Sequence, residues 1–186
     1  MSPLIIILIA VGVLVLWIVS AYNRLITLKN RCAEALSDID VQLKRRFDLI
    51  PNLIETVKGY MAHERGVLEN VTKARTGIME SKGGPIERTA AENQLTGTLK
   101  TLFAVAENYP DLKANANFIE LQREIADTEN KIMASRRFYN ANVQEFKVKT
   151  EVFPSNIIAN YFKFSAPAFF EVQTESEREP VKVKFD

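Results

Sequence analysis

The stretch Asp40–Ile54, DVQLKRRFDLIPNLI, sets the fold class that the sequence predicts. Apolar side chains recur through it and beyond it at spacings of 4, 4, 3, 4 and 3 residues, at Ile39, Leu43, Phe47, Ile50, Ile54 and Val57. This spacing indicates an amphipathic helix. Pro51 lacks an amide hydrogen and clashes with the carbonyl four residues earlier, but the apolar period keeps its phase across it. The stretch therefore predicts one helix kinked at Pro51 rather than two helices joined by a turn.

The same helical period extends in both directions from this stretch. Toward the N-terminus, no Gly or Pro occurs between residues 13 and 50, so the helix can continue into the apolar N-terminal segment. Toward the C-terminus, Gly59 and Gly66 are each expected to weaken the helix by about 1 kcal/mol relative to alanine without ending it. The sequence KGGP at residues 82–85 supplies a glycine C-cap and a following proline. We therefore expect the first soluble helix to cover residues 22–81.

Three further helices are predicted downstream. Apolar stripes indicate helices over Ile86–Asn108 and Phe118–Val152, the latter capped by Asn115 or Asn117. A short fourth helix is expected over Asn156–Phe162. The predicted fold is all-α, with an N-terminal transmembrane helix, an antiparallel up-down bundle of long helices, a short fourth helix and an extended C-terminal tail. Its parts are an anchor (1–21), a helical bundle (22–162) with a membrane-proximal stalk (22–50), and an aromatic-rich tail (163–186).

The segment from Leu4 to Ala21 carries no charged residue. Eighteen helical residues extend about 27 Å, close to the thickness of a bilayer core. Trp17 and Tyr22 flank the far end, where aromatic rings favour the headgroup region. A cleaved signal peptide is the alternative, but no Lys or Arg precedes the apolar run, and the run is longer than a typical signal core. We interpret the segment as a retained membrane span.

The charges that flank this span predict its orientation. Arg24, Lys29 and Arg31 follow the span, whereas only the α-amino group precedes it. The positive-inside rule then places the N-terminus outside and the C-terminal part in the cytoplasm. A periplasmic C-terminal domain is the alternative.

The lengths of the predicted helices differ. The first soluble helix would extend about 90 Å, the second about 35 Å and the third about 53 Å. On these lengths, the half before Pro51 lacks a partner within the chain although its seam is apolar. We therefore expect a stalk that associates with copies of itself or with a partner. The candidate self-association seam consists of Leu25, Leu28, Leu36, Ile39 and Leu43.

Two further groups of side chains are candidate sites. Polar residues beside the seams of the first and third helices could form a layer that fixes helix register, although a solvated face is the simpler interpretation. The tail is rich in phenylalanine, which is unfavourable in water and should dock on the bundle, on a neighbouring chain or on the membrane. The candidate polar layer comprises Asp48, Asn52, Glu55, Asn130, Arg137 and Asn140, and the candidate docking tail comprises Phe162, Phe164, Phe169 and Phe170.

The composition argues against catalysis and against nucleic-acid binding. The 24 basic and 23 acidic residues give a net charge of +1, without the basic surplus of a nucleic-acid binder. Cys32 is the single cysteine and His63 the single histidine, so ligands for a catalytic zinc are nearly absent. His63-Glu64 begins like a zinc-protease motif whose second histidine is missing. We expect no catalytic residue, no metal and no cofactor.

Three long stretches carry a resemblance to a known family. They are YNRL at residues 22–25, DIDVQLKRRFDLIPNLIETVKGYMAHE at 38–64, and VAENYPDLKANANFIELQREIADTENKIMASRRFYNANVQEFKVKTEVFPSNIIA at 105–159. These stretches closely resemble the LemA family of bacterial membrane proteins. The similarity runs from about Tyr22 to Phe170 and is weakest over Thr76–Thr98. It implies a single-pass anchor, a short outer N-terminus and a cytosolic antiparallel helical bundle.

The resemblance implies little about activity, because the family has no established catalytic site. Family members often occur beside membrane-bound metalloproteases, and some relatives serve in organising membranes, which suggests an accessory role by analogy. We therefore expect a non-enzymatic membrane-anchored scaffold or adaptor that contacts the lipid bilayer and forms homo-oligomers. A membrane-shaping or lipid-contacting oligomer is the alternative, and a regulator of a membrane metalloprotease is a lesser one.

Overall fold

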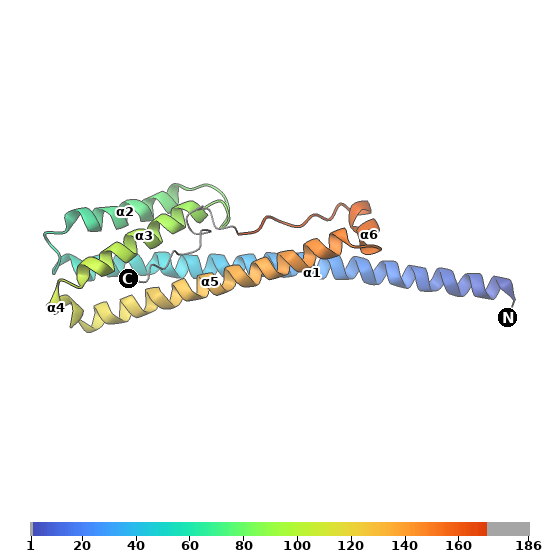
Figure 1. The fold of residues 1–186 in the computed structure, drawn as a ribbon, viewed down its shortest axis with the longest axis horizontal. Helices are drawn as coiled ribbons and strands as arrows, with labels where there is room; N and C mark the ends of the chain where they lie inside the picture. The colour runs from blue at the N-terminus through green and yellow to red at the C-terminus, as the bar shows by residue number, and fades with distance from the viewer. Residues whose placement is uncertain (1, 171–186) are drawn as a thin grey trace, which may run out of the picture. The chain divides into compact units, whose positions relative to one another are not determined.

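The regular structure of the protein is helical. The computed structural model describes residues 2–170, and no β-strand occurs within them, which confirms the all-α prediction. The helices in this range are α1 (Pro3–Lys58), α2 (Arg65–Glu80), α3 (Thr89–Ala106), α4 (Pro110–Lys113), α5 (Ala116–Glu151) and α6 (Ser155–Tyr161) (Figure 1). The end of the chain that we expected to be extended, Val181–Phe185, lies outside the described residues.

These helices form two compact units. Within the described residues, unit 1 combines residues 2–38 with 134–169, and unit 2 combines residues 39–133 with Phe170. The long helices α1 and α5 each contribute one part to each unit, whereas α2, α3 and α4 belong to unit 2 and α6 belongs to unit 1.

Unit 2 is an up-down bundle made by α2, α3 and the parts of α1 and α5 that belong to it (Figure 1). The ion pairs Asp40–Arg88 and Arg46–Glu92 advance in the same direction along α1 and toward α3, so these two helices run parallel. The chain reverses between them through α2, and α5 returns alongside. The buried core of the bundle comprises Ile50, Leu53, Val57, Met61, Val71, Ala74, Ile78, Leu95, Leu99, Leu102, Ala106, Leu112, Phe118 and Ile125.

The first soluble helix is shorter than the sequence predicted. It ends at Lys58, and α2 begins only at Arg65, so the expectation of one helix to residue 81 is wrong. Met61 is fully buried in the core of unit 2, and its amide donates to the carbonyl of Val57 in the intervening turn. Burial of an apolar side chain such as Met61 stabilises the reversal by about 1.5–3 kcal/mol. That gain, added to the weak helix propensity of Gly59, favours the turn over a continued helix.

Pro51 does not interrupt α1. The helix runs unbroken from Pro3 to Lys58, so the prediction of one helix through the proline and into the apolar N-terminal segment is confirmed. Pro51 lies on the exposed side of α1, while Ile50 and Leu53 beside it are buried in the core of unit 2. The missing amide therefore lies on the solvent side of the helix, where water can hydrogen-bond the carbonyl that loses its partner.

Unit 1 is a helical hairpin that α6 closes. In this unit α1 and α5 lie alongside each other and are joined by the Arg24–Glu145 ion pair, and α6 follows the end of α5 (Figure 1). The fully or nearly fully buried apolar side chains of this unit are Leu25, Leu28, Cys32 and Ala35 on α1, Tyr139, Val143 and Phe146 on α5, and Ile158 and Ala159 on α6. The short fourth helix is confirmed, as α6.

The expectation that the membrane-proximal stalk lacks an intrachain partner is wrong. Four members of the candidate self-association seam are buried within the chain, and the fifth, Leu36, is half-buried. The physical reason is the turn after Lys58. Because α2 and α3 reverse the chain early, the 36-residue α5 is long enough to contribute to unit 1 as well as to unit 2. The buried seam members are Leu25, Leu28, Ile39 and Leu43.

Candidate functional site

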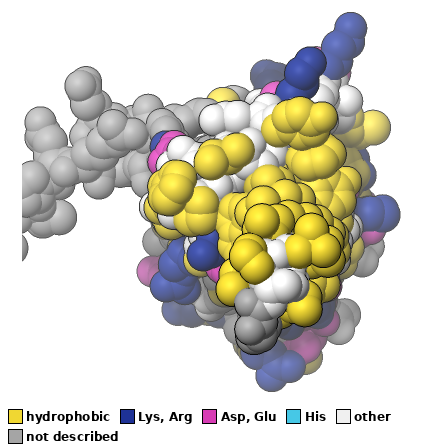
Figure 2. Space-filling model, turned by 90° about the vertical axis from the view of Figure 1, so that its right-hand side faces the viewer, with side chains coloured by type: hydrophobic (Ala, Val, Ile, Leu, Met, Phe, Trp, Pro, Cys, Tyr) yellow, Lys and Arg dark blue, Asp and Glu magenta, His cyan; other side chains and the backbone are white. Residues whose placement is uncertain are grey.

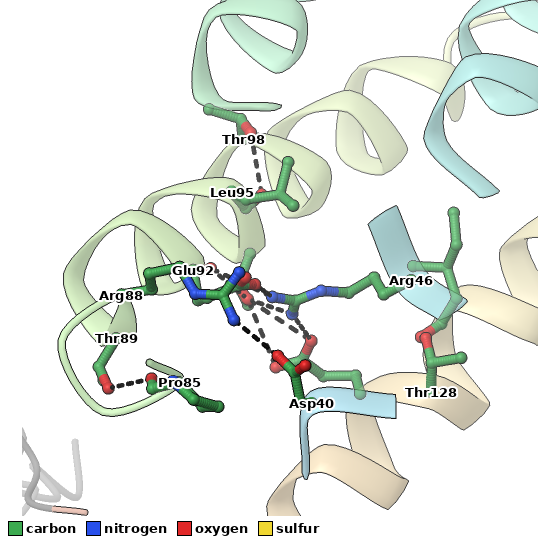
Figure 3. Close-up of polar contacts among 12 residues, drawn as sticks. Asp40, Arg46, Pro85, Arg88, Thr89, Glu92, Leu95, Thr98 and Thr128 are labelled. Carbon is green, nitrogen blue, oxygen red and sulfur yellow. Dashed lines mark hydrogen bonds and ion pairs between the residues drawn. The ribbon is translucent and has the colours of Figure 1, made fainter. Parts of the chain in front are cut away.

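A buried ion cluster joins three helices of unit 2. Arg46 of α1 is only 1% exposed, and its guanidinium forms ion pairs with Glu92 of α3 and Glu129 of α5 (Figure 3). One of its terminal nitrogens also donates to the hydroxyl of Thr96 at 2.9 Å. Glu92 is buried as deeply as Arg46, whereas the side chain of Glu129 is 31% exposed. One cation is therefore held between two carboxylates, one dry and one in contact with solvent.

A second ion pair lies at the rim of this cluster. Arg88 donates to a carboxylate oxygen of Asp40 at 2.6 Å, and both side chains are partly exposed (Figure 3). Arg88, Asp40 and Glu92 also line a surface groove of about 250 Å³. The remainder of the lining includes apolar side chains of α1 and α2, namely Leu43, Phe47, Ile78 and Met79.

The role of this cluster is structural. A buried arginine that pairs with carboxylates from two other helices is costly to desolvate, so it contributes little net stability compared with an apolar core. It does select one arrangement, because a shift of α3 or α5 along α1 would leave a buried charge unpaired. The cluster therefore acts as a register device for the bundle. Among residues 2–170, no group of three His, Cys, Asp or Glu side chains is placed to hold a metal ion.

The sequence contained a signal for this cluster that our interpretation missed. The buried positions on α1 run Leu43, Arg46, Ile50 and Leu53, at spacings of 3, 4 and 3, so the arginine occupies a core-facing position. Glu92 precedes the buried Leu95 by three residues in the same way. The predicted seam uses Phe47 in place of Arg46, and Phe47 is only half-buried. A charged residue at a core-facing position predicts a buried partner.

The predicted polar layer is wrong as a buried layer. Of its six members, only Asn140 is half-buried. Asp48 pairs with Lys44 of its own helix at 2.9 Å, as a solvent-exposed i,i+4 pair. The physical reason is the position of these residues around each helix. They lie beside the apolar seam, and that side of each helix faces solvent. The exposed members are Asp48, Asn52, Glu55, Asn130 and Arg137.

The phenylalanines of the candidate docking tail contact unit 1 in part. The ring of Tyr22 meets Phe162 at 4.7 Å and Phe164 at 5.7 Å between centroids. Phe164 also lies 6.3 Å from Phe146 of α5. The amine of Lys147 lies 5.9 Å from the ring centroid of Phe169, while Phe170, which belongs to unit 2, is buried. The structure thus supports docking of Phe162 and Phe164 on the bundle of their own chain.

Cys32 lies within the packed seam of unit 1 and is a free, buried thiol. Burial raises the pKa of the Cys32 thiol, and the negative charge of Glu145 raises it further. Both effects disfavour the thiolate, which is the reactive form. The structure therefore makes Cys32 a packing residue rather than a nucleophile.

We expect the native protein to protect Cys32 from alkylation. At pH 8, iodoacetamide should modify Cys32 many-fold more slowly in the folded chain than in urea, as followed by mass spectrometry. The matched control is the Ala33→Cys variant in a Cys32→Ala background, because Ala33 is exposed on the same helix. Equal rates at the two positions would contradict the burial of this seam.

No residue in the apolar part of α1 is buried. An 18-residue window of this helix near the N-terminus has a mean hydropathy of 3.1, and none of its residues is buried. By length and composition, α1 is therefore able to cross a membrane. At the end of this part, Trp17 and Ala21 line a groove of about 260 Å³ together with Phe153 and Pro154, which precede α6. Figure 2 shows hydrophobic side chains gathered on this end of unit 1.

A comparison with protein families identifies the family of this chain. The model of the LemA family matches residues 35–185. The chain belongs to the LemA family. That membership confirms the resemblance, and the matched range contains the two longer quoted stretches, at residues 38–64 and 105–159.

Named relatives of this LemA-family chain come from two groups. Protein LemA of Metamycoplasma hominis is 28% identical over 171 residues, which cover 90% of this chain and 76% of that protein. Magnetosome protein MamQ 2 of Paramagnetospirillum magneticum is 22% identical over 175 residues, which cover 81% of this chain and 64% of that protein. Magnetosome protein MamQ of Magnetospirillum gryphiswaldense is 21% identical over 174 residues, which cover 80% of this chain and 64% of that protein. The match spans less than two thirds of each MamQ protein.

The family and the structure together establish a membrane-associated helical protein. The LemA family is membrane-associated, and α1 supplies the apolar helix that such association needs. Neither LemA nor MamQ is the name of a known enzyme. This LemA-family chain thus has two distinctive features, which are the ion cluster around Arg46 in unit 2 and the exposed apolar side chains beside the groove of unit 1.

Proposed function

We propose that the protein is a non-enzymatic scaffold or adaptor anchored in the bacterial inner membrane, with the N-terminus outside and the helical units in the cytoplasm. It would work by self-association and by binding other membrane proteins. The observation that carries the proposal is the continuity of α1, whose single helix contains both the apolar segment and one helix of the unit 2 bundle. A bundle built on the anchor helix itself is suited to holding a partner close to the membrane.

The ion cluster of unit 2 supports a binding role rather than a chemical one. Arg46 contacts Glu92, Glu129 and Thr96 through its two terminal nitrogens, so these nitrogens are committed to internal contacts. The cluster fixes which faces of α3 and α5 point outward from α1. A partner would meet a surface of constant shape, which lowers the entropic cost of binding.

Exposed apolar side chains on unit 2 offer positions at which to test this proposal. Met79 on α2 is 66% exposed and Ile119 on α5 is 51% exposed. A photo-crosslinking amino acid at either position, in the full-length chain and in native membranes, is expected to capture a second copy or one recurring membrane protein. The same probe in an Arg46→Met background should lose this capture, while the chain stays in the membrane, because the bundle has lost its register.

Two outcomes would contradict a scaffold. Gly97, which is exposed on α3, is the control position for the probe. One contradicting outcome is that neither Met79 nor Ile119 gives more cross-linking than this control. The other is capture that persists unchanged when Arg46→Met has unfolded the bundle, since a scaffold surface requires the fold. Capture of a membrane metalloprotease would support the regulatory variant of the proposal.

A second candidate function is a membrane-shaping or lipid-contacting oligomer. It is favoured by the exposed apolar side chains that unit 1 places beside the end of the apolar segment. Deleting the tail from Phe162 would be a poor test, because Phe162 and Phe164 pack on Tyr22. Substitutions at exposed positions of α6 leave that packing intact and are the better test.

A further inference from the structure

The turn between α5 and α6 presents an unusual surface. A short surface helix normally buries one apolar face and exposes a polar one. Here Ile158 and Ala159 of α6 are buried in unit 1, but Ile157 and Tyr161 on its outer side are also apolar and are 57% and 80% exposed. We name the segment from Val148 to Phe162 the elbow. Its exposed apolar side chains are Val148, Val152, Phe153, Ile157, Tyr161 and Phe162.

The elbow lies at the end of the apolar segment of α1. Phe153, which is 78% exposed, lines the same groove as Trp17 and Ala21. Trp17 is an aromatic residue near the end of the apolar run, where the boundary between lipid and water is expected. In unit 1, Val152 and Phe153 of the elbow are therefore at the depth of that boundary. Figure 2 looks toward the N-terminal end of α1 and shows the hydrophobic side chains that gather on this side of the molecule.

Charged side chains border this apolar surface. Arg24 and Lys149 line the groove together with Trp17 and Phe153. Arg24 is paired with Glu145 of α5, whereas Lys149 is exposed on the last turn of α5. Long basic side chains next to an apolar surface can extend to lipid phosphates while their aliphatic stems stay in apolar surroundings. This combination of aromatic, aliphatic and basic side chains is typical of a membrane interface.

We infer that the elbow is a second membrane contact, which inserts Phe153, Ile157 and Tyr161 into the interfacial zone of the bilayer beside the span. The occupant of this surface is lipid, because the surface is continuous with the apolar segment of α1 through the shared groove. The inference rests on the proposal that this segment crosses the membrane. With two contacts, unit 1 is held against the bilayer instead of swinging about a single helix.

Fluorescence quenching tests the inference on the full-length chain reconstituted in phosphatidylethanolamine–phosphatidylglycerol vesicles. In a Cys32→Ala background, an environment-sensitive fluorophore is attached to single cysteines in the variants Phe153→Cys, Phe138→Cys and Leu8→Cys. Phe138 is the matched control, because it is 60% exposed on α5 but lies about 20 Å along the helix axis from the end of α5 at Glu151. Leu8 reports on the span itself.

We expect lipids that carry a doxyl quencher to quench the Phe153 and Leu8 probes several-fold more than the Phe138 probe. Aqueous iodide should show the reverse order. If iodide quenches the Phe153 probe as strongly as the Phe138 probe while Leu8 remains lipid-quenched, the elbow inference is overturned and the anchor stands. If the Leu8 probe is also exposed to iodide, the membrane span and the elbow inference fail together.

A protein occupant would give a third pattern. The Phe153 probe would then be shielded from iodide without being quenched by doxyl lipid, and the shielding would decrease as the protein is diluted in the vesicles. That result would overturn the inference in favour of a second copy at this face. Circular dichroism melting of each labelled variant checks that unit 1 and unit 2 remain folded.

Discussion

Replacing Arg46 by methionine is expected to destabilise unit 2 by about 3–5 kcal/mol, the usual cost of removing one partner from a buried ion pair. The loss arises because Glu92, which is 2% exposed, would remain as a buried carboxylate without its cation. Urea unfolding of the full-length chain in detergent micelles, followed by hydrogen exchange at α3, measures the effect. The exchange data assign the loss to unit 2.

The chain supplies a matched control for this experiment at the neighbouring position. Arg45 carries the same side chain on the same helix and is exposed, so Arg45→Met should change stability by no more than about 0.5 kcal/mol. A double variant, Arg46→Met with Glu92→Leu, should recover most of the loss, because an apolar pair of similar volume avoids the desolvation cost. Similar effects of Arg45→Met and Arg46→Met would contradict the register role of the cluster.

Replacing Phe146 by alanine is expected to destabilise unit 1 by about 3–5 kcal/mol, as found for truncation of large buried aromatic side chains. Phe146 is 1% exposed on α5, and its ring lies 6.3 Å from that of Phe164. The substitution removes this contact and leaves a cavity between α5 and the segment that follows α6. Hydrogen exchange of the α5 and α6 amides, compared between the variant and the native chain, is the measurement.

The exposed Phe138 is the control on the same helix. Phe138→Ala should cost no more than about 0.5 kcal/mol, because this side chain gives up little buried surface. Protein concentration supplies a second test. If unit 1 were assembled from two chains, the stability of Phe146→Ala and of the native protein would rise with concentration in the micelle. Independence of concentration is expected for packing within one chain.

The sequence predicted those features that depend on local pattern. The period through Ile39, Leu43 and Ile50 predicted a helix that the structure confirms, and the period also showed that Pro51 leaves it unbroken. The apolar run at residues 4–21 identified the part of α1 able to cross a membrane. These predictions succeed because the spacing of apolar side chains and the absence of Gly and Pro act over a few turns of one helix.

Contacts between distant segments had to be read from the tertiary structure. The turn after Lys58 depends on the burial of Met61 in a core whose other members lie far along the chain. The same turn decides where α5 lies, and so whether Leu25 and Leu28 need a partner from another chain. No local pattern reports this, because Gly59 is compatible with either a weakened helix or a turn.

The candidate sites divide in the same way. Charges at core-facing positions were visible in the sequence at Arg46 and Glu92, but their pairing required the packing of α1 against α3. The exposure of Phe153 and Tyr161 depends on which face of α6 is buried in unit 1. The sequence by itself determined the helical character of the chain, the apolar segment and the family. The tertiary structure decided which side chains meet, because that depends on contacts between residues far apart in the chain.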